Sequence, residues 1–208
     1  MPVGYDCVVE LADGTRERNT NERRDALVRA SYALFREQGF ANTTMDEVAA
    51  RAGVSRRTAF RYFATKEDLV FPTMQQRTEK LTHLLVPHEG ERNFDTVSRA
   101  CLALARDYQA ERDFLLAQWE IVRHEPSLQA REHHIEREGQ AAIQAALLLG
   151  QKDTTRARRR ARIHAAVIIA AVRATLDSWL EGGASTDLVR LGRETFADLE
   201  HGLASWVE

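Results

Sequence analysis

Two short segments joined by a tight turn constrain this chain more than any other feature. Residues 45–51 and 56–63 each have the pattern of a helix, and the segment Ala-Gly-Val-Ser at 52–55 lies between them. Thr44 stands three residues before Glu47, which is the spacing of a capping box at a helix start. The serine that ends the turn is placed to cap the second segment. The pattern predicts two short helices joined by a turn, which fits a helix-turn-helix.

The rest of the chain has the apolar periodicity of longer helices and few residues that would break them. Only 4 Pro and 11 Gly occur in 208 residues, too few for the turns of a many-stranded β fold. With 44% hydrophobic residues, the chain can bury a sizeable core. The further helices that we expect are 21–38 capped by Thr20, a short one capped by Thr65, and then 69–86, 94–109, 113–124, 126–149, 154–180 and 186–206. These observations predict an all-α protein.

Charge is segregated along the chain although the formal net charge is only -2. Residues 51–66 contain five basic residues and no acidic one. DNA phosphates reward clustered arginine and lysine, and the second helix of a helix-turn-helix lies in the major groove. Arginine can donate bidentately to guanine, and an aromatic ring can pack on a thymine methyl. The expected base contacts are Arg56, Arg57, Phe60 and Arg61.

The stretch over residues 41–69 contains paired threonines, Val-Ala before Ala-Gly-Val-Ser, the pattern Thr-x-Phe-x-Tyr-Phe and a following Lys-x-x-Leu. With these motifs it resembles the N-terminal domain of the tetracycline-repressor (TetR) family of bacterial transcriptional regulators. Leu34-Phe35 and Gly39 also stand at family positions, so the motifs cover about residues 20–70. The resemblance implies three contacts to DNA phosphates: Thr44, Tyr62 and Lys66. The family often has tyrosine where this chain has Phe60, which lacks the hydroxyl donor.

We expect three parts along the chain. Residues 1–19 are polar and without periodicity, which indicates a flexible arm whose Arg16 and Arg18 either enter a minor groove or are disordered. Residues 20–70 form the helix-turn-helix DNA-binding domain, with three helices at its centre. Residues 71–208 form a larger helical domain, to which the resemblance assigns ligand binding and dimerisation.

Apolar surfaces on the last two expected helices favour a homodimer independently of the resemblance. A single chain would not cover both surfaces, and a two-fold dimer would present two recognition helices to a palindromic operator. The residues expected at the dimer interface are Ile163, Val167, Ala170, Ala171, Ala174, Leu188, Leu191, Phe196, Leu199 and Leu203, with Ala166 and Trp206 on the same surfaces.

Aromatic and polar side chains in the middle helices suggest a pocket for a mostly apolar small molecule. The expected lining residues are Cys101, Tyr108, Gln118, Trp119, Arg123 and His124. Aromatic residues at helical spacing are also typical of an ordinary core, and that alternative stays open.

Two clusters outside these sites have competing interpretations. His133 and His134 are flanked by glutamates, but adjacent helix positions point about 100° apart, which favours a charged solvent face over a metal site. The arginine-rich run at residues 156–162 is either a second nucleic-acid patch or a set of partners for Glu136 and Glu138. We expect no metal and no cofactor.

The leading hypothesis is a transcriptional repressor that a small-molecule ligand releases from its DNA operator. Activation instead of repression stays open, because the sequence does not place the operator relative to the promoter. One rival is a helical small-molecule binding protein without DNA activity. The other is a helical enzyme using His124 with Glu120 or Glu125, although no nucleophile, base and orienting group stand together in the pattern.

The sequence favours a cytoplasmic protein, associated with the nucleoid when bound to DNA. No stretch approaches the roughly 20 apolar residues of a membrane span, and the first residues lack the pattern of a secretory signal. Cys7 and Cys101 stand too far apart in sequence to indicate a redox pair. We therefore expect no membrane partner.

Overall fold

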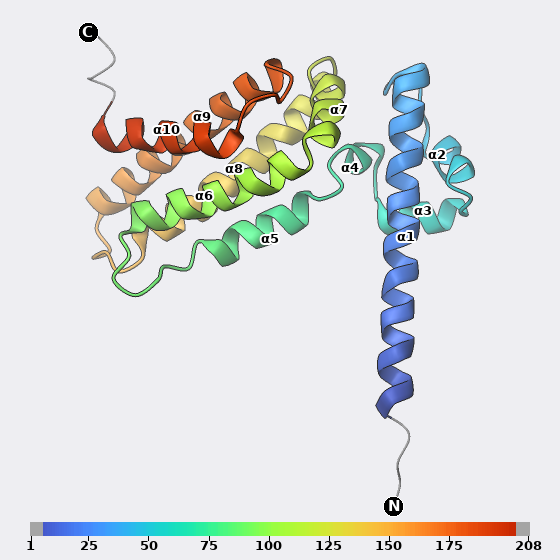
Figure 1. The fold of residues 1–208 in the computed structure, drawn as a ribbon, viewed down its shortest axis with the longest axis horizontal. Helices are drawn as coiled ribbons and strands as arrows, with labels where there is room; N and C mark the ends of the chain where they lie inside the picture. The colour runs from blue at the N-terminus through green and yellow to red at the C-terminus, as the bar shows by residue number, and fades with distance from the viewer. Residues whose placement is uncertain (1–5, 203–208) are drawn as a thin grey trace, which may run out of the picture. The chain divides into compact units, whose positions relative to one another are not determined.

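The computed structural model describes the backbone of residues 6–202 and the side chains of residues 20–202. Every regular element in that part of the chain is helical, which confirms the all-α prediction. The helices are α1 (Asp6–Gln38), α2 (Met45–Arg51), α3 (Arg56–Tyr62), α4 (Lys66–Val70), α5 (Met74–Leu84), α6 (Asn93–Ala110), α7 (Arg112–Val122), α8 (Pro126–Leu148), α9 (Thr155–Glu181) and α10 (Leu188–His201). They form two compact units, Met1–Pro72 and Thr73–Glu208 (Figure 1).

The first unit packs α2 and α4 against α1, and α3 against α2. The expected caps are present: Thr44 and Glu47 form a reciprocal capping box, and the Ser55 hydroxyl accepts from the Thr58 backbone N–H. Gly53 has a φ of 68°, a conformation that glycine adopts without strain. The buried side chains that join the four helices are Leu27, Leu34, Phe35, Phe40, Val48, Ala49, Ala59, Phe63, Leu69 and Val70.

The first helix is longer than the sequence pattern predicted. It begins at Asp6, so residues 6–19 are helical instead of forming a flexible arm, and Thr20 lies within the helix instead of capping its start. Extending an existing helix costs far less than nucleating one, and residues 6–19 contain no proline to stop it. The side chains of Arg16 and Arg18 lie outside the described ones.

Two other helix boundaries differ from the expected ones. The helix expected over 69–86 is interrupted between α4 and α5 by Phe71, Pro72 and Thr73. Proline has no N–H to donate and disfavours the helical conformation of the residue before it. At the other end of the second unit, α10 ends at His201, before Gly202 with its φ of 86°. Leu203 and Trp206 lie outside the described residues.

In the second unit, α6 contacts α5, α7, α8 and α10, while α9 packs mainly against α8 and α10 (Figure 1). One apolar cluster joins α5, α6, α8, α9 and α10 through buried residues such as Val97, Ile143 and Phe196. A second cluster surrounds Trp179, whose indole N–H donates to the Thr186 carbonyl at 2.8 Å. The two clusters together make the core that fixes these helices.

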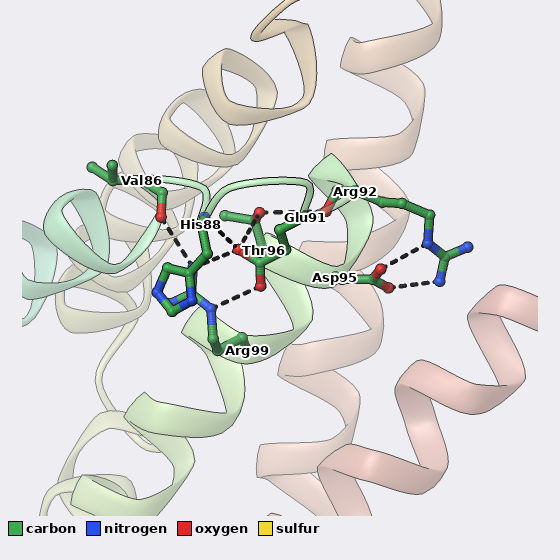
Figure 2. A network of polar contacts seen from close by, with 7 residues as sticks. All are labelled: Val86, His88, Glu91, Arg92, Asp95, Thr96 and Arg99. Atoms are coloured by element: carbon green, nitrogen blue, oxygen red, sulfur yellow. Dashed lines mark hydrogen bonds and ion pairs between the residues drawn. The ribbon is translucent and has the colours of Figure 1, made fainter.

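A network of polar contacts orders the loop between α5 and α6 (Figure 2). The Glu91 carboxylate accepts from the backbone N–H of His88, the hydroxyl of Thr96 and the guanidinium of Arg99, each at 2.9 Å. Arg99 also donates to the Val86 carbonyl at 3.0 Å. The hydrogen bond from Arg99, followed by that from the His88 backbone, lowers the pKa of Glu91 to about 2.

The Glu91→Gln variant should lower the melting temperature of the chain at neutral pH. The ionised Glu91 stabilises the fold above its ordinary pKa of 4.5, and this stabilisation is lost as the pH falls toward the folded-state pKa of about 2. Calorimetric scans between pH 7 and pH 3 should therefore show the gap between wild type and variant closing with acid. Glu89→Gln, at an exposed position of the same loop, is the control. A gap that stays constant with pH would contradict the assignment.

Candidate nucleic-acid interface

The helix α3 is seated in the first unit by one buried face. Ala59 is 0% exposed, and Phe63 directly after the helix is 3% exposed. Because these positions point inward, the four residues on the remaining surface of α3 face solvent: Arg56, Arg57, Phe60 and Arg61. All four residues expected as base contacts therefore share one exposed surface.

An acidic residue on α2 holds one of these arginines. The Asp46 carboxylate accepts from Arg56 at 2.8 Å, and the Arg56 guanidinium lies 5.4 Å from the centre of the Phe60 ring. No sequence pattern marks Asp46 as a partner of Arg56, because an acidic residue in the first turn of a helix is explained by the helix dipole alone. Arg57 is exposed and has no ion pair within the described residues.

The three expected phosphate contacts have different environments. Thr44 is exposed, and its hydroxyl is engaged with the Glu47 carboxylate at 2.8 Å within the capping box. Tyr62 is partly buried, and its hydroxyl accepts from Arg61 at 3.3 Å. Burial raises the pKa of Tyr62, but the hydrogen bonds from Arg61 and Thr20 and the charges of Arg61 and Arg23 outweigh it, so this pKa is lowered.

Lys66 has a structural role that the resemblance did not suggest. Its ammonium donates to the Phe40 carbonyl at 2.7 Å and to the Ala41 carbonyl at 3.3 Å. It also lies 4.3 Å from the centre of the Phe40 ring. Two of its three donors are thereby engaged beyond the end of α1, which weakens the case for Lys66 as a phosphate contact.

Arg51 belongs to the framework of the first unit. Both of its terminal nitrogens donate to the Glu37 carboxylate at 2.6 Å, in a bidentate pair that ties α2 to α1. The cationic segment 51–66 therefore divides into arginines on the outer surface of α3 and basic residues that brace the fold.

The residues expected to line a ligand pocket separate into two groups. Cys101, Tyr108 and Trp119 pack against the apolar clusters of the second unit, and Gln118 is partly buried on α7. Burial raises the pKa of Cys101 to about 12 and also raises that of Tyr108. These three side chains on α6 and α7 therefore form a partly buried interior group.

The other two expected lining residues lie at the surface beyond α7. Arg123 and His124 are exposed, and both face the Glu120 carboxylate at 3.4 Å. The Arg123 guanidinium lies 4.5 Å from the centre of the Trp119 ring. They cover the outer side of α7 instead of pointing into the core.

Sequence reasoning missed Arg77, a buried cation beside this interior group. It is 8% exposed, stands 4.5 Å from the centre of the Tyr108 ring and pairs with Glu111 at 2.6 Å. Its neighbours in sequence are polar, so no apolar pattern marks the position as buried.

The residues expected at the dimer interface also separate. On α9, Ile163 and Val167 are 53% and 43% exposed, and Ala170 and Ala174 are exposed beside the half-buried Ala171. On α10, the apolar residues are used within the chain: Leu188 and Phe196 are buried in the two clusters, and Leu191 and Leu199 pack against them. Among the described residues of the expected surface, the most exposed apolar side chains are those on α9.

By length and composition, α9 could cross a membrane. Of its most apolar 18-residue segment, 22% is buried within the chain. Its Arg173 guanidinium pairs with Glu132 on α8 at 2.6 Å and with Asp177 at 2.8 Å. A helix tied to its neighbours by such pairs fits a protein bundle, so we interpret the exposed apolar face as a protein interface.

Two other expected pairings are resolved differently. Glu136 contacts Arg173, and Glu138 contacts His134. The alternative in which these two glutamates pair with the arginine run at residues 156–162 is therefore wrong. Within that run, Arg158 pairs with Asp153 at 3.2 Å. The histidines lie on an exposed helix face, and the described residues contain no group of three or more metal-binding side chains.

Replacing Lys66 by methionine should destabilise the chain, because it removes two hydrogen bonds and the contact with the Phe40 ring. We expect the free energy of unfolding to fall by about 1–2 kcal/mol. Urea unfolding followed by circular dichroism measures it, with Arg57→Ala as an exposed control whose stability should equal that of wild type. Equal stability of Lys66→Met and wild type would show that the ammonium is not a structural group.

Comparison with known proteins finds similarity to one family model and to curated regulators. Residues 27–71 match the family model described as bacterial regulatory proteins, tetR family. The chain is 35% identical over 102 residues to the HTH-type transcriptional regulator TcmR of Streptomyces glaucescens, over 47% of this chain and 45% of TcmR. It thus spans less than half the length of that relative.

Solved structures share the fold over most of the chain. NalD, the secondary repressor of the MexAB-OprM multidrug efflux pump in Pseudomonas aeruginosa, has a TM-score of 0.62 at 19% identity, over 88% of this chain and 96% of NalD. Thermus thermophilus FadR, a TetR-family repressor in complex with lauroyl-CoA, has a TM-score of 0.52 at 24% identity, over 85% of this chain and 92% of FadR. These matches show that residues 27–71 are similar to the tetR family of bacterial regulatory proteins and that the chain shares its fold with the two solved structures.

Proposed function

We propose that this chain is a DNA-binding transcriptional regulator, and that it represses transcription until a small molecule releases it from a palindromic operator. The observation that carries the proposal is the outer surface of α3, where three arginines and an aromatic ring are exposed. The opposite face of this short helix is buried against the rest of the first unit. The outer surface has the size, charge and placement of a recognition helix in a major groove.

In this proposal, Arg57 and Arg61 supply the most available donors to base edges. Arg57 is free of ion pairs within the described residues, so it can turn toward guanine N7 and O6 without breaking a contact. Phe60, 39% exposed, offers an apolar edge to a thymine methyl and has no hydroxyl to donate. Arg56 binds bases at the cost of loosening its pair with Asp46, which makes its contribution smaller.

Phosphate contacts position such a helix without reading sequence. Tyr62 suits this role because its hydroxyl lies beside a guanidinium, in a locally cationic environment. Thr44 stands at the N-terminus of α2, where backbone N–H groups and the helix dipole favour an anion. Lys66 keeps one donor for a phosphate, while its other two hold the fold.

Release by a ligand requires a second site, which we place in the interior group beside α6 and α7. Cys101, Tyr108 and Trp119 supply apolar and aromatic surface there, and the buried Arg77 supplies a cation. Such a lining suits a mostly apolar small molecule with one polar end. The ligand would favour one arrangement of these helices and thereby lower the affinity for DNA, by the reciprocity of coupled binding.

We further propose that the protein acts as a homodimer in the cytoplasm and has no enzymatic activity. Two copies related by a two-fold axis present two α3 helices to the halves of a palindrome. The matched relatives carry the names of transcriptional regulators, which supports a regulatory and not a catalytic role.

Binding to the promoter DNA of its own gene tests the function. Arg57→Ala should weaken specific binding by about 1–3 kcal/mol, because it removes a donor to base edges. Tyr62→Phe should weaken binding to all DNA sequences alike and leave the salt dependence unchanged, because it removes a phosphate contact but no positive charge. Fluorescence anisotropy at several salt concentrations measures both effects.

The matched control is Arg190→Ala, which removes an exposed arginine of α10 that pairs with Glu194 and should leave DNA affinity unchanged. Absence of sequence-specific binding by wild type would refute the proposed function. Equal effects of the Arg57 and Arg190 variants would refute the assignment of α3 as the reader.

If the ligand site lies where we propose, a variant should be able to lose ligand binding and keep DNA binding. In a thermal-shift screen of apolar small molecules, a compound that stabilises wild type should not stabilise Tyr108→Ala, which loses aromatic surface in the proposed site. The variant should still bind promoter DNA, and Arg123→Ala at the surface should keep the ligand response. A response that survives in Tyr108→Ala but is lost in Arg123→Ala would move the site to the outer side of α7.

A further inference from the structure

The ion pair between Arg77 and Glu111 is uneven in its exposure to water. The side chain of Arg77 is 9% exposed and that of Glu111 is 45% exposed, and their charged atoms lie 2.6 Å apart. Within the described residues, Glu111 is the only ion-pair partner of Arg77. The buried cation therefore depends on one carboxylate, which reaches it from the surface.

The two partners of this pair do not need one another equally. A buried guanidinium that loses its carboxylate is left as an uncompensated charge, which destabilises the fold. Glu111, once released, is already half in water and stands at the start of α7, where the helix dipole favours a negative charge. The fold therefore needs a carboxylate at Arg77 more than it needs that carboxylate to belong to Glu111.

A second ion pair between α5 and α6 lacks this asymmetry. Lys80 on α5 and Asp107 on α6 pair at 2.5 Å, with side chains that are 48% and 34% exposed. Both charges can be hydrated when this pair opens, so an external anion gains little by replacing Asp107. The contrast sets Arg77 apart as a position where an external anion can replace the carboxylate of the chain.

The surroundings of Arg77 indicate what kind of anion fits. Its guanidinium lies 4.5 Å from the centre of the Tyr108 ring, which packs against the apolar cluster around Trp179. Leu81, four residues further along α5 and so on the same side of the helix, is buried in the other apolar cluster. An anion with an apolar body can contact these surfaces, whereas an inorganic anion has no apolar part to place there.

We propose that the small molecule sensed by this chain is an apolar monocarboxylate whose carboxylate replaces that of Glu111 on Arg77. The inference rests on the proposed ligand-responsive regulator and names the chemical class of its ligand. Arg77 belongs to α5, the first helix of the second unit, and Glu111 lies at the junction of α6 and α7. The exchange therefore removes an ion pair that ties this junction to the helix that follows the first unit along the chain.

Chemical rescue of the Glu111→Ala variant tests the exchange. The probe is phenylacetate, an aromatic ring with a carboxylate, and its uncharged amide, phenylacetamide, is the matched compound. Glu111→Ala should melt below wild type, because Arg77 loses its partner. Phenylacetate should raise the melting temperature of this variant more than that of wild type, and phenylacetamide should not. Differential scanning fluorimetry measures each shift.

Two further variants are the controls. Asp107→Ala loses the exposed pair with Lys80 on the same two helices, and it should respond to phenylacetate no more than wild type does. Arg77→Met leaves the exposed Glu111 in water and should lose the preference for phenylacetate over phenylacetamide. Absence of rescue in Glu111→Ala, or equal rescue of Asp107→Ala, would overturn the exchange.

Direct binding measures the competition between Glu111 and the added carboxylate. Glu111→Gln keeps the size of the side chain and removes its charge, so it should bind phenylacetate about tenfold more tightly than wild type does. Isothermal titration calorimetry gives both dissociation constants. Weaker binding of phenylacetate to Glu111→Gln than to wild type would show that Glu111 belongs to the ligand site and is not displaced from it.

The outcomes separate this inference from the proposed function, because the rescue is measured without DNA. Wild type that binds promoter DNA, together with a Glu111→Ala variant that phenylacetate does not rescue, would overturn the exchange and leave the regulator intact. Rescue without any effect of phenylacetate on promoter binding would overturn the claim that such an anion is the sensed molecule. Failure of wild type to bind promoter DNA would refute the function even if the rescue succeeds.

Discussion

The packing of two seven-residue helices onto α1 is the constraint on which the rest of the structure depends. Helices of this length are unstable in isolation, so their ends and one buried face must supply the stability. The caps at Thr44 and Ser55 satisfy backbone groups, and Ala59 with Phe63 anchors α3 to the core. Only this anchoring lets α3 turn its arginines outward as a rigid surface.

Basic residues in the first unit serve two physical purposes that sequence alone does not separate. Arg51 and Lys66 satisfy a carboxylate and backbone carbonyls, so they hold α1, α2 and α4 together. Arg57 is left without such a partner among the described residues. A cationic segment near a turn therefore overstates the number of side chains available to DNA.

Helix caps and turns were predictable from the sequence, whereas contacts between residues far apart in the sequence were not. The caps and the turn at Gly53 depend on residues within a few positions, so their pattern identified them. The start of α1 was missed because a helix can continue through a polar stretch that has no stop signal. Arg77 was missed because burial of a charge depends on Tyr108 and Glu111, which are distant in sequence.

The same limit explains the apolar surfaces of the last two helices. Periodicity identified a face on each but not what covers it, and the structure assigns Leu188 and Phe196 to the core of the chain itself. On α9 the apolar face stays exposed among the described residues. Periodicity therefore identifies an apolar face, whereas the contacts within the chain decide whether that face is buried.

Methylation protection of promoter DNA tests the central claim, that α3 reads the major groove, most directly. The account predicts that the bound protein shields guanine N7 atoms in two half-sites whose centres lie about 34 Å apart or at a multiple of that spacing. These protections should disappear selectively with Arg57→Ala. Protection confined to adenine N3 in the minor groove, or no protected guanine at all, would contradict it.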